Sequence, residues 1–507
     1  MNITINTAAL NGIDAILVSV EIDISNGLPN FNIVGLGDTA VKESKERVRS
    51  AIINSGFEFP IGRIVINLAP ADLKKEGSLF DLPIAVGILL ATQQIKFDVK
   101  ENFLFMGELS LSGQLKRVKG ALPIILQGRE NNIRKFIVPY DNAEECSLAK
   151  DIDIYAFNNL SQVADFMRYG DLLPYEGKKE LDTNRKETLD YAEVIGQESS
   201  KRAVEVACAG GHNMALFGPP GCGKTMLSKR IPSILPPLSY SESLEVTKIY
   251  SICGKLEQNK GLISCRPFRS PHHTASKIAL VGGGNKLLPG EISLAHNGVL
   301  FLDEILEFNK TVLNVLRQPL EDREITITRY NGSVKYPANF MLVAALNPCP
   351  CGYYGSGVRQ CICSEFERNR YIKKFSGPLL DRIDIFTFVN SLSYNEIKNS
   401  KVCETSEDIR KRVVEARELQ RERFKDNNIY CNAQMTQKHI NKYCKLDNKL
   451  NALMEKIYLK FNLSARAYSR ILKVSRTIAD LNHREEIEEV DLIEALQYRK
   501  FVSGKIV

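Results

Sequence analysis

Residues 218–225 read GPPGCGKT and follow directly on the apolar run MALF at 214–217. The octet matches G-x-x-x-x-G-K-[S/T], a pattern in which glycines let backbone N–H groups turn toward phosphate oxygens at the start of a helix. The sequence therefore predicts a strand, a phosphate-binding loop and a helix in that order. The nucleotide-contacting residues predicted from this loop are Gly218, Pro219, Pro220, Gly221, Cys222, Gly223, Lys224 and Thr225.

Two acidic residues further along the chain extend this predicted site. The apolar run VLFL at 299–302 ends in Asp303 and Glu304. Lys224 is expected to neutralise the β- and γ-phosphates of ATP, while Thr225 and Asp303 are expected to hold Mg²⁺. Glu304 then lies where a carboxylate polarises the attacking water. The acidic pair therefore predicts hydrolysis of the nucleotide as well as its binding.

A third apolar run, MLVAAL at 341–346, ends in Asn347. Its side-chain amide is suited to hold the attacking water or the γ-phosphate, the role known as sensor 1. Buried strands interleaved with helices are typical of a mostly parallel sheet that is covered on both faces. We therefore expect an α/β ATPase domain in which Glu304 and Asn347 are catalytic.

Further segments resemble the ComM/YifB family of magnesium-chelatase-like AAA+ ATPases, and the resemblance extends over nearly the whole chain. They are VIGQ at 194–197, RPFRSPHHTAS at 266–276, GGG at 282–284, NPCPCG at 347–352 and SGPLLDRID at 376–384. The resemblance implies a central AAA+ phosphate-loop domain with a doubly wound parallel sheet, followed by a helical lid. His272 and His273 lie in the second segment; we assign them no chemistry and expect structural hydrogen bonding.

The same resemblance implies two arginines that reach nucleotide. Arg382 lies where this branch of AAA+ proteins, similar here to the MCM helicases, places an arginine finger for a neighbouring subunit's γ-phosphate. A guanidinium there stabilises charge on the transferring phosphoryl group, so the resemblance implies a homo-oligomeric ring, a hexamer. The alternative for Arg382 is an ion pair with Asp381 or Asp384 of its own chain. Arg466 resembles the sensor 2 arginine, which touches nucleotide.

The chain is long enough for about three domains of roughly 150 residues each. We expect an α/β domain at 1–172, an exposed charged linker at 173–190, the ATPase domain with a cysteine cluster at 191–394, and the helical lid at 395–507.

The first domain contains GELSLSG at 107–113 and FIVP at 136–139, which resemble the proteolytic domain of Lon proteases and the related domain of RadA. Lon cuts peptides with a serine–lysine dyad. Here Asp81 lies near the nucleophile position and Leu122 at the lysine position. Without a lysine to deprotonate it, a serine such as Ser78 is a poor nucleophile. We therefore expect a non-proteolytic module for DNA binding or ring assembly.

Four of the twelve cysteines form two C-x-C pairs, namely Cys349, Cys351, Cys361 and Cys363. Four thiolates suffice for one tetrahedral zinc ion, although the C-x-C spacing is tighter than usual. The surrounding residues are rich in glycine and tyrosine and are poorly suited to build an apolar core, so a metal would staple the loop. The alternative is four free thiols. We expect structural Zn²⁺.

Residues 325–337 (ITITRYNGSVKYP) alternate as β-strands do and carry Asn-Gly at 331–332, which predicts a hairpin. In MCM-like helicases a hairpin at this point of the chain projects into the ring's channel. Arg329, Tyr330 and Lys335 supply cations and an aromatic ring that suit phosphate contacts and base stacking along a single strand. The alternative is a solvent-exposed hairpin with ordinary surface charges.

The bulk composition sets broader limits. The chain has 67 Lys and Arg against 60 Asp and Glu, a formal charge of +7 that permits a polyanionic partner without requiring one. Hydrophobic residues make up 44% and charged residues 25%, as in ordinary globular proteins. No run is apolar enough to span a membrane and the start lacks the basic region of a signal peptide, so we expect a cytoplasmic protein without a membrane partner.

These features predict an ATP- and Mg²⁺-dependent ring motor that acts on single-stranded or branched DNA. It would resemble the helicase and branch-migration function in recombination that is ascribed to the ComM type in natural transformation. One alternative is a magnesium-chelatase-like motor that drives metal insertion into a porphyrin. Another is a nucleotide-gated chaperone or scaffold, which would bind ATP and partners without DNA-stimulated turnover.

Overall fold

The computed structural model describes residues 2–96, 102–170, 172–177, 189–257, 261–284, 287–329, 332–357, 359–375, 377–392, 394–398, 403–427, 429–461 and 463–499. The chain forms two compact units that do not follow its order. Unit 1 comprises residues 1–183, 240–264 and 328–335, and unit 2 comprises 184–239, 265–327 and 336–507. Two segments from the middle of the sequence therefore fold with its beginning.

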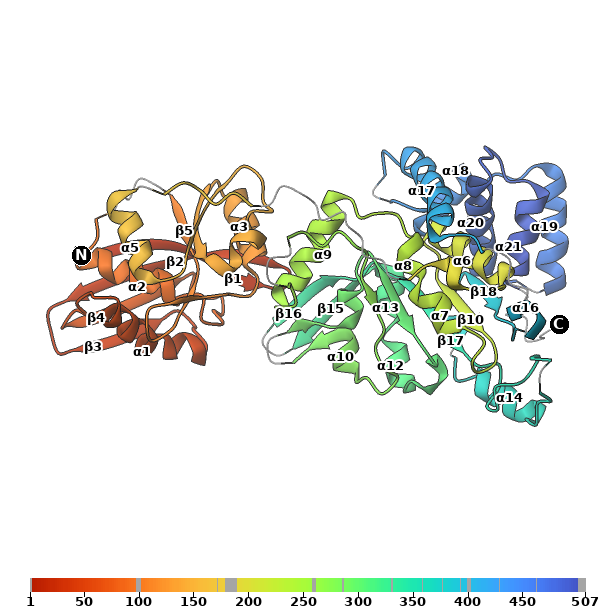
Figure 1. Ribbon diagram of the computed structural model, residues 1–507, viewed down its shortest axis with the longest axis horizontal. Coiled ribbons are helices and arrows are strands. Elements are labelled where there is room, and N and C mark those ends of the chain that lie inside the picture. Colours follow the sequence, from red (N-terminus) through yellow and green to blue (C-terminus); the bar gives the residue numbers. More distant parts are fainter. Residues whose placement is uncertain are drawn as a thin grey trace. The chain divides into compact units, whose positions relative to one another are not determined.

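Unit 1 is built on a seven-stranded sheet in the order β3-β4-β2-β1-β5-β8-β9 (Figure 1). The strands are β1 (Asn2–Asn11), β2 (Asp14–Ser25), β3 (Asn30–Val34), β4 (Arg63–Ala69), β5 (Phe103–Phe105), β8 (Lys135–Pro139) and β9 (Asp153–Phe157). The chain turns between β1 and β2 at Gly12, whose φ of 66° favours glycine. β1 and β2 run antiparallel, whereas β5, β8 and β9 are parallel neighbours.

Helices cover this sheet, and one of them is apolar on nearly every side. They are α1 (Thr39–Asn54), α2 (Asp81–Ala91), α3 (Ala121–Glu130), α4 (Ala143–Cys146) and α5 (Leu160–Tyr169), with a small β6 (Glu108–Leu109) and β7 (Leu115–Lys116) ladder beside them. α2 is buried from Asp81 to Leu90 and packs against β1 and β2. A helix with so little polar surface belongs inside a domain, so α2 lies at the centre of the unit 1 core.

Unit 1 also contains α9 (Tyr240–Ile252), which lies far from the other unit 1 helices in sequence. α9 packs against α3, and the N–H of Gly120 donates to the carbonyl of Ser251 over 3.2 Å. The hydroxyl of Tyr240 donates to the carbonyl of Leu148 over 2.7 Å. Arg117 donates to the carbonyl of Leu256 over 3.1 Å. Backbone and side-chain contacts therefore fasten this inserted segment to unit 1.

Unit 2 is built on a five-stranded sheet in the order β11-β14-β17-β10-β18. The strands are β10 (Met214–Phe217), β11 (Phe268–Arg269), β14 (Val299–Leu302), β17 (Met341–Leu346) and β18 (Ile385–Phe388), and all neighbours run parallel. β10, β14 and β17 are buried along their whole length. The predicted mostly parallel α/β sheet is thus confirmed.

Short elements surround the sheet. The helices are α6 (Glu198–Gly210), α7 (Lys224–Lys229), α8 (Ile231–Ile234), α10 (Lys277–Val281), α11 (Glu291–Leu294), α12 (Lys310–Asn314), α13 (Arg317–Asp322), α14 (Glu365–Ile372), α15 (Gly377–Leu380) and α16 (Tyr394–Lys398). A small ladder pairs β12 (Gly282–Gly283) with β13 (Leu288–Pro289). A hairpin pairs β15 (Glu324–Arg329) with β16 (Gly332–Pro337), and its residues 328–335 belong to unit 1. The strands predicted on either side of the Asn-Gly turn are therefore present.

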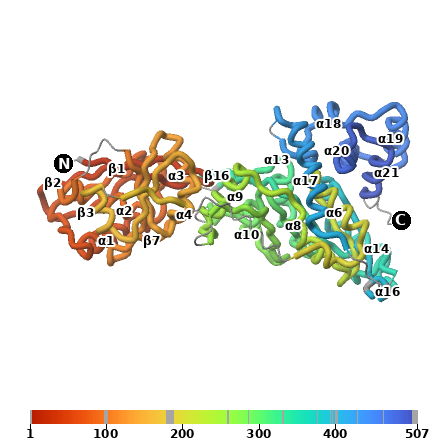
Figure 2. The backbone as a smooth tube through the Cα atoms, turned by 45° about the horizontal axis from the view of Figure 1, so that its top comes forward, coloured from red at the N-terminus to blue at the C-terminus, as the bar shows by residue number. Residues whose placement is uncertain are grey.

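The described residues from 403 to 499 are mainly helical (Figure 2) and belong to unit 2. Their helices are α17 (Ser406–Arg423), α18 (Gln437–Tyr443), α19 (Asn448–Phe461), α20 (Ala465–Leu481) and α21 (Glu489–Gln497). α17 and α20 pack against α6 and share its apolar core with the sheet. Among the described residues, no helix combines the length and apolar character needed to cross a membrane.

Candidate nucleotide site

The phosphate-binding loop connects β10 to α7. Gly221 and Gly223 have φ of 75° and 98°, a backbone conformation that residues with side chains rarely adopt. A Cβ on Gly218 would lie 2.4 Å from the carbonyl oxygen of Val389. A Cβ on Gly352 would lie 2.7 Å from Pro220, which brings the NPCPCG turn against the loop. These glycines are therefore required by the path and the packing of the backbone.

Lys224 links the loop to the predicted sensor 1 residue. Its ammonium donates to the carbonyls of Gly218 over 2.7 Å and Pro219 over 2.9 Å, and to Oδ1 of Asn347 over 3.2 Å. Burial lowers the pKa of Lys224, because the charged form loses hydration. β10 and β17 are adjacent parallel strands, so the residues that follow their carboxyl ends meet at one edge of the sheet.

Thr225 and Asp303 meet at the same edge. The Thr225 hydroxyl donates to Oδ2 of Asp303 over 2.8 Å, and Oδ1 of Asp303 accepts from the N–H of Glu304 over 3.0 Å. A hydroxyl and a carboxylate are hard oxygen ligands of the kind that Mg²⁺ prefers. The side chains that the sequence assigns to Mg²⁺ thus fit that ion and lie in contact.

Glu304 has an unusual backbone. Its φ of 50° and ψ of 46° place it in the left-handed region, which is uncommon for a residue with a side chain. Such a conformation costs of order 1–3 kcal/mol and persists only when the surroundings impose it. Its side chain is 57% exposed, so water reaches the carboxylate. Glu304 therefore combines a strained backbone with a solvent-accessible carboxylate. It directly follows Asp303, the residue that contacts Thr225.

The two predicted nucleotide-contacting arginines converge on a residue of α13. Arg382 forms an ion pair with Glu321 and donates to the carbonyl of Pro378. Arg466 lies 3.8 Å from the same Glu321 oxygen. The alternative considered for Arg382, an ion pair within the chain, is thus present in this structure, but its partner is Glu321 instead of Asp381 or Asp384. Sequence reasoning missed Glu321, because an acidic residue on a short helix is ordinarily a solvated charge.

Asp384 takes part in a different network, which ties β18 to the helical region. It pairs with Arg470, accepts from the backbone N–H of Asn213 over 3.1 Å and lies 3.5 Å from His212. The other ring nitrogen of His212 lies 2.8 Å from the Thr477 hydroxyl on α20. Burial opposes ionisation of Asp384, but Arg470 and His212 outweigh it, so the pKa of Asp384 is lowered.

The four cysteines of the two C-x-C pairs are brought together, and their ligand atoms all lie within 4.8 Å of one another. Sulfur–sulfur distances are 3.3 Å for Cys349–Cys351 and 3.6 Å for both Cys349–Cys361 and Cys351–Cys361. A tetrahedral zinc ion with bonds of about 2.3 Å would separate its thiolates by roughly 3.8 Å. The arrangement therefore fits a zinc site closely.

Ionisation within this cluster is uneven. Burial and the neighbouring thiol raise the pKa of Cys349 to about 12. Burial also opposes ionisation of Cys351, but the N–H of Tyr353 and the thiol of Cys349 outweigh it and lower the pKa of Cys351 to about 6. Of these two thiols, Cys351 is thus the more readily ionised, and metal binding would displace the protons that remain.

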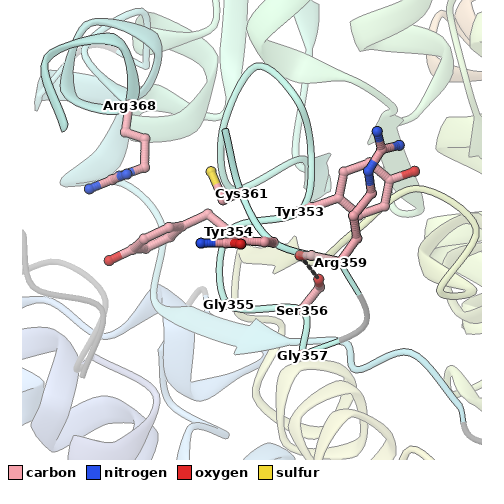
Figure 3. A pocket seen from close by; sticks show the side chains of 9 residues that line it. Tyr353, Tyr354, Gly355, Ser356, Gly357, Arg359, Cys361 and Arg368 are labelled. Carbon is pink, nitrogen blue, oxygen red and sulfur yellow. Dashed lines mark hydrogen bonds between the residues drawn. The ribbon is translucent and has the colours of Figure 1, made fainter. Parts of the chain in front are cut away.

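A pocket of about 420 Å³ lies beside the cluster, lined by two tyrosines, two arginines, glycines and Cys361 (Figure 3). The Arg368 guanidinium lies 4.3 Å from the ring centroid of Tyr354, and that of Arg359 lies 5.2 Å from the ring of Tyr353. Arg368 also donates to the carbonyl of Cys363 over 2.7 Å. Stacked side chains therefore support the loop where it lacks apolar packing.

Only part of the predicted DNA hairpin can be placed. Lys335 is exposed on β16, and residues 328–335 belong to unit 1. A Cβ on Gly12 would lie 2.3 Å from Cγ1 of Val334, so Val334 lies against the turn between β1 and β2 within unit 1. Arg329 ends β15, but its side chain and Tyr330 lie outside the described residues.

The Lon-like positions in unit 1 carry no serine–lysine pair. Asp81 begins α2, is fully buried and forms an ion pair with Arg47 over 2.7 Å. Burial raises the pKa of Asp81 to about 6, although Arg47 opposes this. The Ser78 hydroxyl donates to the carboxylate of Glu108, and Leu122 is buried in α3. The two residues predicted to lie at the dyad positions, Asp81 and Leu122, are thus a buried carboxyl and a buried apolar side chain.

Family models of the magnesium chelatase group match most of this chain. Three family models match: "Magnesium chelatase, subunit ChlI" at residues 190–397, "Subunit ChlI of Mg-chelatase" at 20–142 and "Magnesium chelatase, subunit ChlI C-terminal" at 403–499. The chain is 46% identical to competence protein ComM of Haemophilus influenzae, covering 97% of this chain and 96% of that protein.

Two further relatives are informative. The chain is 43% identical to YifB of Escherichia coli, covering 98% of this chain and 96% of that protein. It is 29% identical to Lon protease 2 of Bacillus subtilis over 165 residues, covering 29% of each chain.

Proposed function

This chain belongs to the ComM/YifB family of magnesium-chelatase-like proteins, and we propose that it is a Mg²⁺-dependent ATPase whose subunits form a ring that acts on DNA. Membership of this family indicates an AAA+ ATPase. The observation that carries the proposal is the contact of Thr225 with Asp303 at the sheet edge where Lys224 meets Asn347.

In the proposed reaction, Lys224 binds the β- and γ-phosphates and Asn347 helps to hold the γ-phosphate and the attacking water. Glu304 polarises that water as general base. Thr225 and Asp303 are the residues that would hold Mg²⁺, which when bound neutralises charge on the phosphates. Positioning and charge stabilisation supply most of the catalysis in phosphoryl transfer, so the pre-assembled edge suits this chemistry.

Arg382 is proposed to act on the nucleotide of a neighbouring subunit, with Arg466 close beside it. Both guanidiniums approach one carboxylate oxygen of Glu321, so they lie on the same side of the chain and can serve one phosphate group together. An arginine finger supplied by a neighbour makes turnover depend on assembly. This supports a ring, and by resemblance a hexamer.

DNA is the proposed substrate of the ring. The support is the similarity to the competence protein ComM, together with Lys335 on the hairpin and the positive net charge. The N-terminal module is proposed to be Lon-like in fold and non-proteolytic, with a role in DNA binding or assembly; its likeness to Lon protease 2 and the absence of a dyad lysine at Leu122 support this. The helices after residue 403 are proposed to form the lid.

The cysteine cluster is proposed to hold one structural Zn²⁺. Four sulfur atoms within 4.8 Å of one another would provide all the ligands of a closed site, so no coordination position would be left for substrate. The metal would staple a loop that packs directly on Pro220 of the phosphate-binding loop, through Gly352.

The proposal is tested by measuring ATP hydrolysis alone, with single-stranded DNA and with forked DNA. Wild-type protein should hydrolyse ATP faster with DNA, whereas Lys224→Ala should fail to bind nucleotide and Glu304→Gln should bind it without turnover. Turnover that requires a porphyrin substrate would favour the chelatase-like motor. ATP binding without DNA binding or stimulated turnover would favour the scaffold or chaperone.

A further inference from the structure

His273 lies beside the carboxylate of Glu304. Its Nδ1 is 3.8 Å from Oε2 of Glu304, and its side chain is 34% exposed. We infer that His273 is a positioning residue for Glu304, holding the general base in the direction of the attacking water. This inference rests on the proposed ATPase function and gives a role to the histidine pair that the sequence left unassigned.

The fold itself brings the two residues together. β11 and β14 are adjacent parallel strands in which Arg269 is paired with Leu300. His273 follows the carboxyl end of β11 (Phe268–Arg269) and Glu304 follows the carboxyl end of β14 (Val299–Leu302). Loops that leave neighbouring parallel strands at one edge lie side by side. The pairing is therefore a consequence of sheet topology.

The loop that carries His273 is anchored at its start. Arg269 holds Glu291 through two hydrogen bonds of 2.6 and 2.8 Å, and Phe268 stacks on Phe301 with ring centroids 5.8 Å apart. Arg266 donates to the carbonyl of Asn297 over 2.7 Å. These contacts fix β11 to the strand that leads to Glu304, so the loop starts from a defined point.

The imidazole of His273 is also held from its other sides. The rings of His272 and His273 lie 4.1 Å apart, and the ring of Phe308 meets His273 edge-on at 6.4 Å. Phe308 is buried. His272 is itself fixed, because its Nδ1 lies 2.9 Å from the Thr274 hydroxyl. An aromatic wall on one side and a hydrogen-bonded neighbour on the other restrict the ring that faces Glu304.

Glu304 needs such a partner. Ordering a glutamate side chain costs up to about 2 kcal/mol, and this one is more than half exposed on a left-handed backbone. Among the described residues, His273 is the one basic side chain with a nitrogen within 4.0 Å of this carboxylate. A general base must lie within hydrogen-bonding reach of the water that it activates, so a side chain that moved freely would lose turnover without losing ATP affinity.

The test measures kcat and KM of ATP hydrolysis separately in the variants His273→Ala and His273→Gln. His273→Ala is expected to lower kcat about tenfold, a fraction of the 10²–10⁴-fold that general base catalysis supplies, while KM stays near wild type. His273→Gln keeps a side-chain donor and is expected to recover most of the turnover. In the Glu304→Gln background, removing the histidine should leave the residual rate unchanged.

The outcomes distinguish this inference from the proposed function. If wild-type protein hydrolyses ATP and Glu304→Gln does not, but His273→Ala keeps wild-type kcat or exceeds it, the positioning role is overturned while the ATPase stands. Loss of turnover in both His273 variants with equal loss of thermal stability would mean that the ring only supports the fold, which also overturns the inference. Absence of hydrolysis in wild-type protein would instead overturn the proposed function.

Discussion

The guanidinium of Arg382 is ion-paired with the carboxylate of Glu321 in the same chain. Arg382 is almost fully buried, whereas the side chain of Glu321 is 50% exposed. A finger that has to reach a neighbouring subunit must leave this partner first. The ion pair therefore competes with assembly of the proposed composite site.

Glu321→Gln is expected to favour that assembly. A half-exposed ion pair contributes up to about 1 kcal/mol, so its removal should lower the protein concentration for half-maximal ATPase activity by up to about fivefold. The measurement is specific activity as a function of subunit concentration. A higher half-maximal concentration in the variant would mean that Glu321 prepares the arginine for its neighbour instead of restraining it.

Mixing two inactive variants tests the finger itself. Arg382→Ala keeps its own nucleotide site and Glu304→Gln keeps its own finger. In a random mixture about a quarter of the interfaces combine an intact site with an intact finger, so the mixture should hydrolyse ATP faster than either variant alone. A mixture no more active than the average of its components would place Arg382 at the nucleotide of its own chain.

Zinc is expected at about one ion per chain, bound by the cysteine cluster. Cys361→Ser should lose the metal and lower the thermal unfolding midpoint, because the loop has little apolar packing to replace it. Cys265, an exposed cysteine outside the cluster, supplies the matched control: Cys265→Ser should keep both zinc and stability. Elemental analysis of the three purified proteins measures the zinc content. Near-zero zinc in wild-type protein would contradict the proposed structural zinc site.

Acid should weaken the network around Asp384. The pKa of this carboxyl is lowered from the ordinary 3.8, since Arg470 and His212 outweigh the effect of burial. Its contribution to stability is therefore fully present above pH 3.8 and is lost as the pH falls below that value. Urea unfolding from pH 5 to pH 3 should show a shallower loss for Asp384→Asn than for wild type. Asp165→Asn, at an exposed carboxylate, should keep the wild-type slope.

Lys335 is expected to contact a DNA phosphate. Lys335→Ala should then weaken binding of unrelated single-stranded sequences alike and reduce the slope of log K against log salt by about 1. Fluorescence anisotropy over a series of salt concentrations measures both quantities. Lys42, exposed on α1, is the control position. An unchanged slope for Lys335→Ala would exclude this residue from the DNA contact.

Local sequence patterns predicted the three strands and the loop that bring the side chains of the nucleotide site together. The glycines, lysine and threonine of 218–225 are neighbours in sequence, and each run at 214–217, 299–302 and 341–346 is a fully buried strand of one sheet. In a parallel sheet such strands bring the residues after them to one edge. The meetings of Thr225 with Asp303 and of Lys224 with Asn347 follow from that geometry.

Contacts between distant segments were not predictable in the same way. Glu321 and Arg382 meet because α13 and the turn after α15 pack together, and no periodicity in either segment specifies this. His273 and Glu304 meet because β11, a strand of two residues that is too short to give a pattern, pairs with β14. α9 joins the core of unit 1 from the middle of the sequence, and no motif in it specifies that core.

The position of α9 has a consequence for how this chain can be divided. Leu244 of α9 packs against the core of unit 1, and the chain passes between units at Ser239–Tyr240 and again at Ser264–Cys265. A gene split at the charged linker would separate the first 172 residues from a helix that completes their core. A chain without residues 240–264 would therefore lack the helix that packs on α3 in unit 1.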